Sequence, residues 1–120
     1  MADLITAERK RELDAIVAER VLNIEVLCDV GNYYLKAHNG SKSLPLYSFD
    51  IEAAYEVIEN RLADGWNLTV QYSQAEQEWT ALFGKLQLCK LVGKSAKSQP
   101  VAICLAALET VNVVVEPKWE

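Results

Sequence analysis

Hydrophobic and polar residues alternate along two segments of the chain, which is the pattern of a strand with one buried face. Residues 66–73 run Trp-Asn-Leu-Thr-Val-Gln-Tyr-Ser, and residues 23–30 alternate in the same way. Each segment is followed by a turn signal and by a second candidate strand, at 33–37 and at 78–85. The alternation therefore predicts two hairpins, with residues 86–92 as an extension of the second hairpin or as a fifth strand.

Two other segments repeat apolar residues every three or four positions, which is the period of an amphipathic helix. They cover residues 6–22 and residues 50–63, with Ser48 and Asp50 as candidate N-cap residues of the second. Gly65, just past the second segment, can adopt the left-handed conformation that ends many helices. The periodicity predicts two helices, each with one face toward a core.

A third helix is predicted from an uninterrupted apolar run, residues 102–108, with Cys104 near its centre. Ser98 offers an N-cap oxygen and Pro100 is tolerated in a first helical turn, so the helix is expected over residues 99–110. A helix that is apolar on all sides is buried on more than one side, and one of about a dozen residues is too short to span a bilayer. We expect Cys104 to be a small buried residue, with a reactive thiol as the less favoured alternative.

Together these elements predict an α+β fold in which one antiparallel sheet of four or five strands packs with three helices, an α-β-α sandwich. The Gly, Ser and Pro content of residues 38–45 and the Gly and Ser content of residues 93–98 predict loops, and residues 111–117 are a candidate edge strand. A length of 120 residues predicts one domain over residues 1–120. If helices cover both faces of the sheet, the polar row of residues 66–73 must find partners in a helix, water, a ligand or a second chain. A homo-oligomer is one solution, and it is the one we expect.

Composition and charge disfavour several classes of partner and site. The net charge of -5 disfavours a long duplex of nucleic acid, which is bound by basic surfaces. Three widely spaced cysteines and a single histidine fit neither a disulfide framework nor a metal site. The chain starts without a signal-peptide pattern and contains no membrane-length apolar run. We therefore expect a cytoplasmic protein with reduced thiols, no metal and no membrane partner.

The chain offers no convergent set of catalytic side chains. His38, the single histidine, lies in an Asn-Gly turn of the kind that is usually exposed. Residues 92–98 end like a phosphate-binding loop, but Leu88 stands where that motif requires glycine. We therefore expect a protein without enzymatic activity and without a cofactor, which leaves its ligand chemically unchanged.

One stretch departs from the acidic character of the chain, because residues 85–97 contain four lysines and no acid. A phosphate group is held by cations and backbone donors, and a nucleotide base by aromatic faces. The stretch therefore makes a small nucleotide a candidate ligand, with solvated lysines on strand ends and loops as the alternative. The candidate phosphate contacts are Lys85, Lys90 and Lys94, and the candidate stacking residues are Trp79 and Tyr47.

Three groups of residues carry a family resemblance: Glu12-Leu13-Asp14 with Val17-Ala18-Glu19, the pattern Ile51, Ala53, Ala54, Tyr55, Val57 and Glu59, and Pro100 with residues 102–108. Over about residues 10–113 the chain resembles the phage ABA sandwich family. It departs from the family in having Tyr55 where tryptophan is usual and Asn23-Ile24 where Gly-Trp is usual. No aromatic contact is therefore carried over to those positions.

The resemblance implies an antiparallel sheet between helices, a gene of phage or prophage origin, and no catalytic residue set. Small phage proteins of this general type are often counter-defence factors, and some such families bind nucleotide second messengers of bacterial immunity without cleaving them. By that analogy of setting, the chain is expected to sequester a cyclic oligonucleotide or a signal of the cyclic ADP-ribose type. The alternatives are an anti-CRISPR-like inhibitor that binds a host nuclease through acidic helix faces, and a phage accessory protein with no small ligand.

Overall fold

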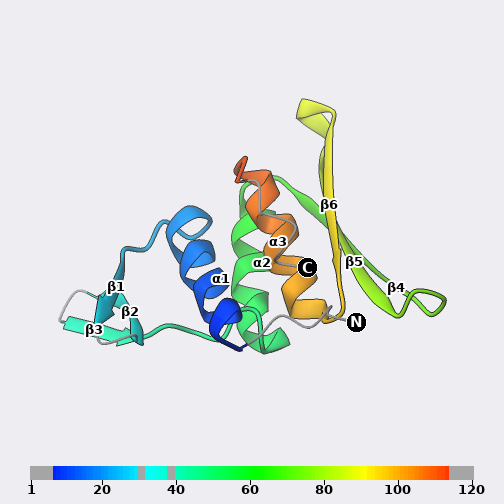
Figure 1. Cartoon of the computed structure of the whole chain (residues 1–120). Helices are drawn as coiled ribbons and strands as arrows, with labels where there is room; N and C mark the ends of the chain where they lie inside the picture. The colour runs from blue at the N-terminus through cyan, green and yellow to red at the C-terminus, as the bar shows by residue number, and fades with distance from the viewer. Residues whose placement is uncertain (1–6, 30–31, 38–39, 114–120) are drawn as a thin grey trace.

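The computed structural model describes residues 7–29, 32–37 and 40–113. It confirms the three predicted helices and the antiparallel pairing of the strands (Figure 1). The helices are α1 (Ala7–Arg20), α2 (Ile51–Ala63) and α3 (Gln99–Thr110). The strands are β1 (Val26–Asp29), β2 (Asn32–Ala37), β3 (Gly40–Ser43), β4 (Asn67–Ser73), β5 (Glu78–Lys85) and β6 (Lys90–Ala96).

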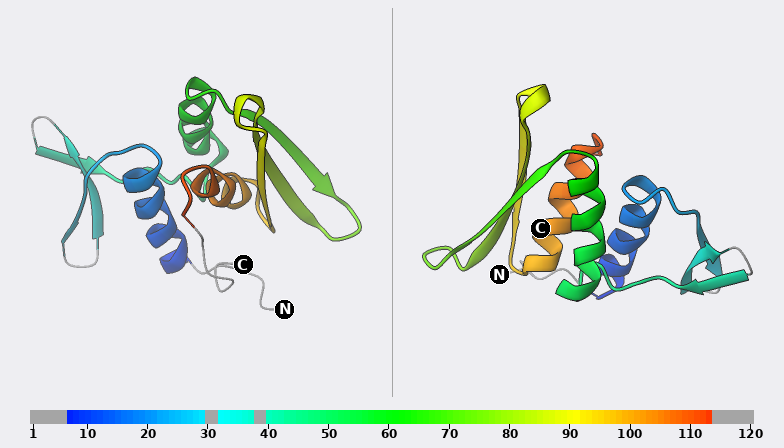
Figure 2. Two further views of the ribbon diagram at one scale, coloured as in Figure 1. Left: turned by 90° about the horizontal axis from the view of Figure 1, so that it is seen from above. Right: turned by 180° about the vertical axis from the view of Figure 1, so that it is seen from behind.

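The strands of the described chain form two separate sheets, ordered β1-β2-β3 and β4-β5-β6. The helices lie between the two sheets (Figures 1 and 2). The prediction of a single sheet of four or five strands covered by helices is therefore wrong, because the helices form the middle layer. The first sheet packs mainly on α1, whereas the second packs on α3 and α2. Alternation within a strand does not show which helix covers it.

Strands also form in two segments that were predicted as loops. β3 lies within residues 38–45, and most of residues 93–98 belongs to β6. Gly93 has a packing role in β6, because a Cβ atom at that position would collide with the side chain of Leu82 on the neighbouring strand. Residues 114–117 of the predicted edge strand lie outside the described residues.

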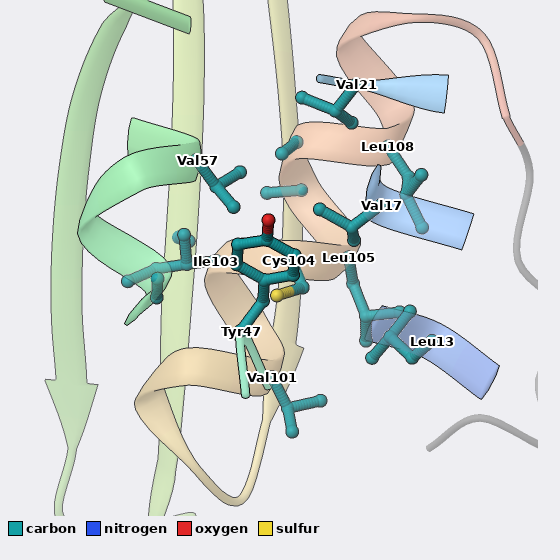
Figure 3. Packing of buried hydrophobic residues seen from close by; sticks show 14 of the residues in the cluster. Leu13, Val17, Val21, Tyr47, Val57, Val101, Ile103, Cys104, Leu105 and Leu108 are labelled. Carbon is teal, nitrogen blue, oxygen red and sulfur yellow. The ribbon is translucent and has the colours of Figure 1, made fainter. Parts of the chain in front are cut away.

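Helix α3 is the centre of the core, as its apolar run predicted. Every residue from Val101 to Leu108 is buried. Ser98 caps the helix by accepting a hydrogen bond from the backbone N–H of Val101 at 3.3 Å. One side of α3 packs on β5 and β6, and the other side packs on α1 and α2. Figure 3 shows Cys104 and Leu105 among the side chains of this core, so the predicted burial of the cysteine is confirmed.

A buried carboxylate ties α1 to the segment that leads into α2. Asp14 of α1 is fully buried, and its carboxylate accepts one hydrogen bond from the Ser48 backbone N–H and one from Arg11, each at 2.7 Å. Arg11 also donates to the carbonyl oxygen of Leu44 at 2.7 Å. Burial raises the pKa of the Asp14 carboxyl, although the bonds from Ser48 and the charge of Arg11 act in the opposite direction. The Ser48 hydroxyl donates to the carbonyl oxygen of Lys10, and the N-cap of α2 is Asp50, whose side chain accepts a hydrogen bond from the Glu52 backbone N–H.

Replacing Leu105 by alanine should lower the free energy of unfolding by about 2–5 kcal/mol, because it removes buried contacts and leaves a cavity beside α3. Leu105 is 1% exposed, whereas Leu46 is 46% exposed and belongs to no helix or strand. Leu46→Ala is therefore the matched control and should cost clearly less unfolding free energy than Leu105→Ala. Urea unfolding followed by circular dichroism measures both values. Equal losses in the two variants would contradict the central position of α3.

Candidate ligand site at the tip of the second sheet

The hairpin of β5 and β6 extends past the ends of the helices and finishes in an exposed tip (Figure 1). Lys85 is the last residue of β5, and Lys90, its partner across the ladder, is the first of β6. Between them lie a 3-10 turn, Leu86–Leu88, and Cys89 in the left-handed conformation with φ 50°. The Cys89 N–H donates to the carbonyl oxygen of Leu86 at 2.9 Å, which closes the turn. The turn therefore brings the two lysines side by side.

A hollow of about 430 Å³ lies at this tip. Its volume falls within the range of sites that hold small molecules. Strand β4 contributes two polar side chains, and the β5–β6 hairpin contributes leucines, a cysteine and the two lysines. We call it the strand-tip pocket, and its lining residues are Asn67, Thr69, Leu82, Gly84, Lys85, Leu86, Cys89, Lys90 and Leu91.

The two lysines of the pocket are in different electrostatic environments. Lys85 Nζ lies 3.6 Å from Asp64 Oδ2 and 5.5 Å from the centroid of the Trp66 ring, and its side chain is 18% exposed. Lys90 is exposed and makes no ion pair with any residue that the structure describes. A ligand can therefore meet Lys90 without displacing a protein partner, whereas the charge of Lys85 is shared with Asp64.

Lys94 and Trp79 lie away from this pocket. Lys94 Nζ is 3.7 Å from Glu109 Oε2 of α3, so its charge is used within the fold. Trp79 is near the start of β5, roughly 20 Å from Lys85 at the usual rise of a strand. Its ring packs on that of Tyr72, with 4.9 Å between the ring centroids. Neither residue lines the strand-tip pocket.

Tyr47 is part of the core. Its side chain is fully buried, and Figure 3 shows it beside Cys104 of α3. Burial raises the pKa of its hydroxyl group well above the ordinary value. A ring in this position offers no face to a base, so the structure is at odds with the predicted stacking role. Of the five predicted contacts, Lys85 and Lys90 line the strand-tip pocket, and the other three do not.

The polar wall of the pocket was not predicted as a binding site. Asn67 and Thr69 belong to the polar row of β4, which is exposed because the helices pack only on the opposite face of this sheet. Water can satisfy these side chains, so the argument for a homo-oligomer based on this row loses its premise. Alternation in the sequence indicated that the row shares one face. The sequence did not show which residues of the next strand lie beside this row. The structure shows that Thr69 pairs with Leu82 of β5.

A second hollow, of about 340 Å³, is lined by Arg11, Asn32, Tyr33, Tyr34 and Ser43. Its cation, Arg11, already binds the buried carboxylate of α1, so this hollow is a weaker candidate for a ligand site.

Within the described residues, no group of three or more His, Cys, Asp or Glu side chains is placed to hold a metal ion. The helices of the described chain are all too short or too polar to cross a membrane. His38 lies outside the described residues.

The sequence model of the phage ABA sandwich domain matches residues 15–108, which extend from α1 to α3 and include the strand-tip pocket. The chain belongs to the phage ABA sandwich domain family. The resemblance found in the sequence is thereby confirmed, and the protein is a phage protein of this family.

Among solved structures, the crystal structure of a phage protein from Bacillus cereus ATCC 14579 is similar in fold, with a TM-score of 0.77. The two sequences are 20% identical, and the similarity covers 94% of this chain and 96% of that chain. At this identity the likeness shows the fold that the two phage proteins share. A comparison with curated proteins found no match.

Two of the three thiols should react quickly with a disulfide reagent in the native protein. Cys28 and Cys89 are exposed, whereas Cys104 is buried in α3, where burial also raises the pKa of its thiol. Cys28 and Cys89 should therefore react at once in dilute native protein, and Cys104 only after denaturation. Mass spectrometry of the labelled peptides identifies the sites. Rapid native labelling of Cys104 would contradict the packing around α3.

Proposed function

We propose that this phage protein binds a small nucleotide signal of host immunity in the strand-tip pocket and sequesters it without chemical change. The observation that carries the proposal is the cross-strand pair of Lys85 and Lys90 at the wall of a hollow of about 430 Å³. The whole chain has a net charge of -5. A local pair of cations in an acidic protein favours a small anion over a long nucleic acid, which needs an extended basic surface.

Each part of the pocket suits a part of such a ligand. The ammonium group of Lys90 can pair with a phosphate oxygen. The amide of Asn67 and the hydroxyl of Thr69 offer donors and acceptors to a sugar or to the edge of a base. Leu82 and Leu91 offer apolar surface to the face of a base, in place of the aromatic stacking that the sequence suggested.

The side chains of the pocket support binding without turnover. Its walls carry neither a carboxylate nor a histidine, the groups that most often transfer protons in enzymes. Asp64, the acid that pairs with Lys85, is also engaged by Arg61, each at 3.6 Å. A nucleotide recovered from the protein should therefore have the same mass as the nucleotide that was added.

Calorimetric titration with cyclic di- and trinucleotides and with cyclic ADP-ribose isomers should detect one ligand that binds at micromolar concentration or below. Lys90→Ala should weaken its binding at least about tenfold, because a hydrogen bond to a charged group contributes about 1.5–3 kcal/mol. Lys97→Ala is the matched control, since Lys97 is an exposed lysine of the same basic stretch but does not line the pocket. This variant should bind like the wild type.

The same ligand should slow the chemical labelling of Cys89, which lines the pocket, and should leave the labelling of Cys28 unchanged. Equal loss of affinity in Lys90→Ala and Lys97→Ala would place the ligand elsewhere. An absence of binding across the panel, together with a stable complex with a host nuclease, would instead support the inhibitor hypothesis. Cleavage of the nucleotide would contradict sequestration.

A further inference from the structure

The tip of the β5–β6 hairpin carries three strongly exposed leucines. Leu86, Leu91 and Leu88 are 86%, 71% and 57% exposed. Leu86 and Leu88 lie on the 3-10 turn and Leu91 lies near the start of β6, at the end of the hairpin that projects beyond the helices (Figure 1). Single exposed leucines are ordinary on protein surfaces, but several at one protruding tip form an apolar surface of the kind found at interfaces. We call these three residues the tip leucines.

Helix α2 exposes a second apolar surface. Ile51, Tyr55 and Leu62 share one stripe of the helix, because steps of four and seven residues return to the same side. They are 40%, 59% and 47% exposed, and Figure 2 (right) shows α2 in front of α3 without a covering element. A row of exposed glutamates runs beside the stripe. We call the two rows together the α2 face: Ile51, Glu52, Tyr55, Glu56, Glu59 and Leu62.

The two surfaces carry opposite charges. The tip belongs to the stretch 85–97, which contains lysines and no acid, and Lys90 has no ion pair within the described residues. The α2 face contains glutamates as its only charged residues. Two copies of a chain with a net charge of -5 repel each other in most orientations. Contact between the tip and the α2 face is an orientation in which they attract.

We infer that the chain pairs with a second copy of itself, with the tip leucines of each copy resting on the α2 face of the other. Within one copy both surfaces are exposed, so the tip does not cover its own α2 face. A two-fold axis lets the contact be made twice, because each copy supplies one tip and one α2 face. Making the contact twice also brings the buried area toward the roughly 800 Å² per partner of stable interfaces. Leu86, Lys90 and Leu91 also line the strand-tip pocket, so the pairing and the proposed nucleotide share this surface. The pairing is measured without nucleotide, so that its failure and the failure of nucleotide binding are separate results.

Light scattering of the wild-type protein at micromolar concentration should give about twice the 13.4 kDa of one chain. Leu86→Asp combined with Leu88→Asp should give the mass of one chain, because carboxylates cannot be buried in an apolar contact. Leu27→Asp is the matched control, since Leu27 is an exposed leucine of the first sheet, and it should leave the pair intact. Circular dichroism verifies that each variant is folded. A wild-type mass of 13.4 kDa, or a pair that survives the double replacement, would overturn the inference.

A mixing experiment tests which two surfaces meet. The Leu86→Asp, Leu88→Asp variant keeps an intact α2 face, and Tyr55→Asp keeps an intact tip. Each variant alone should have the mass of one chain, because neither of its two possible contacts is complete. Mixed together they should form a weaker pair, since one complete tip-to-helix contact remains. A Tyr55→Asp variant that still pairs with itself would point to tip-to-tip contact, and either that result or an absence of mixed pairs would overturn the inference.

The charges provide an independent readout. Lys90→Glu and Glu56→Lys should each shift the protein toward the mass of one chain, because each replaces an attraction by a repulsion. A chain that carries both replacements should pair again, because the charges of the two surfaces are then exchanged and still attract each other. A combined variant that dissociates more than either single variant would contradict the proposed contact between these surfaces.

Discussion

The burial of α3 on two sides is the constraint on which the arrangement of the other elements depends. This apolar helix of 12 residues needs a covering layer on each side, and β5 with β6 supplies one while α1 with α2 supplies the other. Ala102, Ala106 and Ala107 are fully buried and small, which lets those layers approach closely. Because the helices lie together on one side, the β4–β6 sheet keeps its other face open to solvent. The strand-tip pocket and the exposed hairpin tip both follow from that arrangement.

The helices were predicted well because each one carries its own periodicity, capping residue or apolar run. The layering was not predictable in this way, because alternation shows which side chains share a face of a strand and not which helix covers that face. β6 illustrates a second difficulty. Gly93 and Ser95 are typical of loops, yet in this strand Gly93 makes room for Leu82, and the Ser95 hydroxyl is hydrogen-bonded to the hydroxyl of Thr80 at 2.7 Å. Both reasons depend on the neighbouring strand and are absent from the local sequence.

The candidate site was predicted where the relevant residues are close in sequence. Lys85 and Lys90 become neighbours because a tight turn joins the two strands. Lys94 shares their charge but lies farther along β6, where an acid of α3 pairs with it. Tyr47 was misjudged because it precedes α2 in a segment without periodicity, and tertiary packing around α3 buries it. Charge patterns thus indicated the basic hairpin, while the packing of the fold determines which of the predicted residues line the strand-tip pocket.

Native-state hydrogen exchange tests the central position of α3 most directly, because it measures the opening free energy of each segment separately. If α3 joins both layers, its amides can exchange only when the whole fold opens. The account predicts that residues 101–110 are the slowest of the chain and that their exchange follows the global unfolding free energy. Amides of residues 86–91 at the hairpin tip should exchange first. Exchange of α3 at a rate similar to that of the tip would contradict the account.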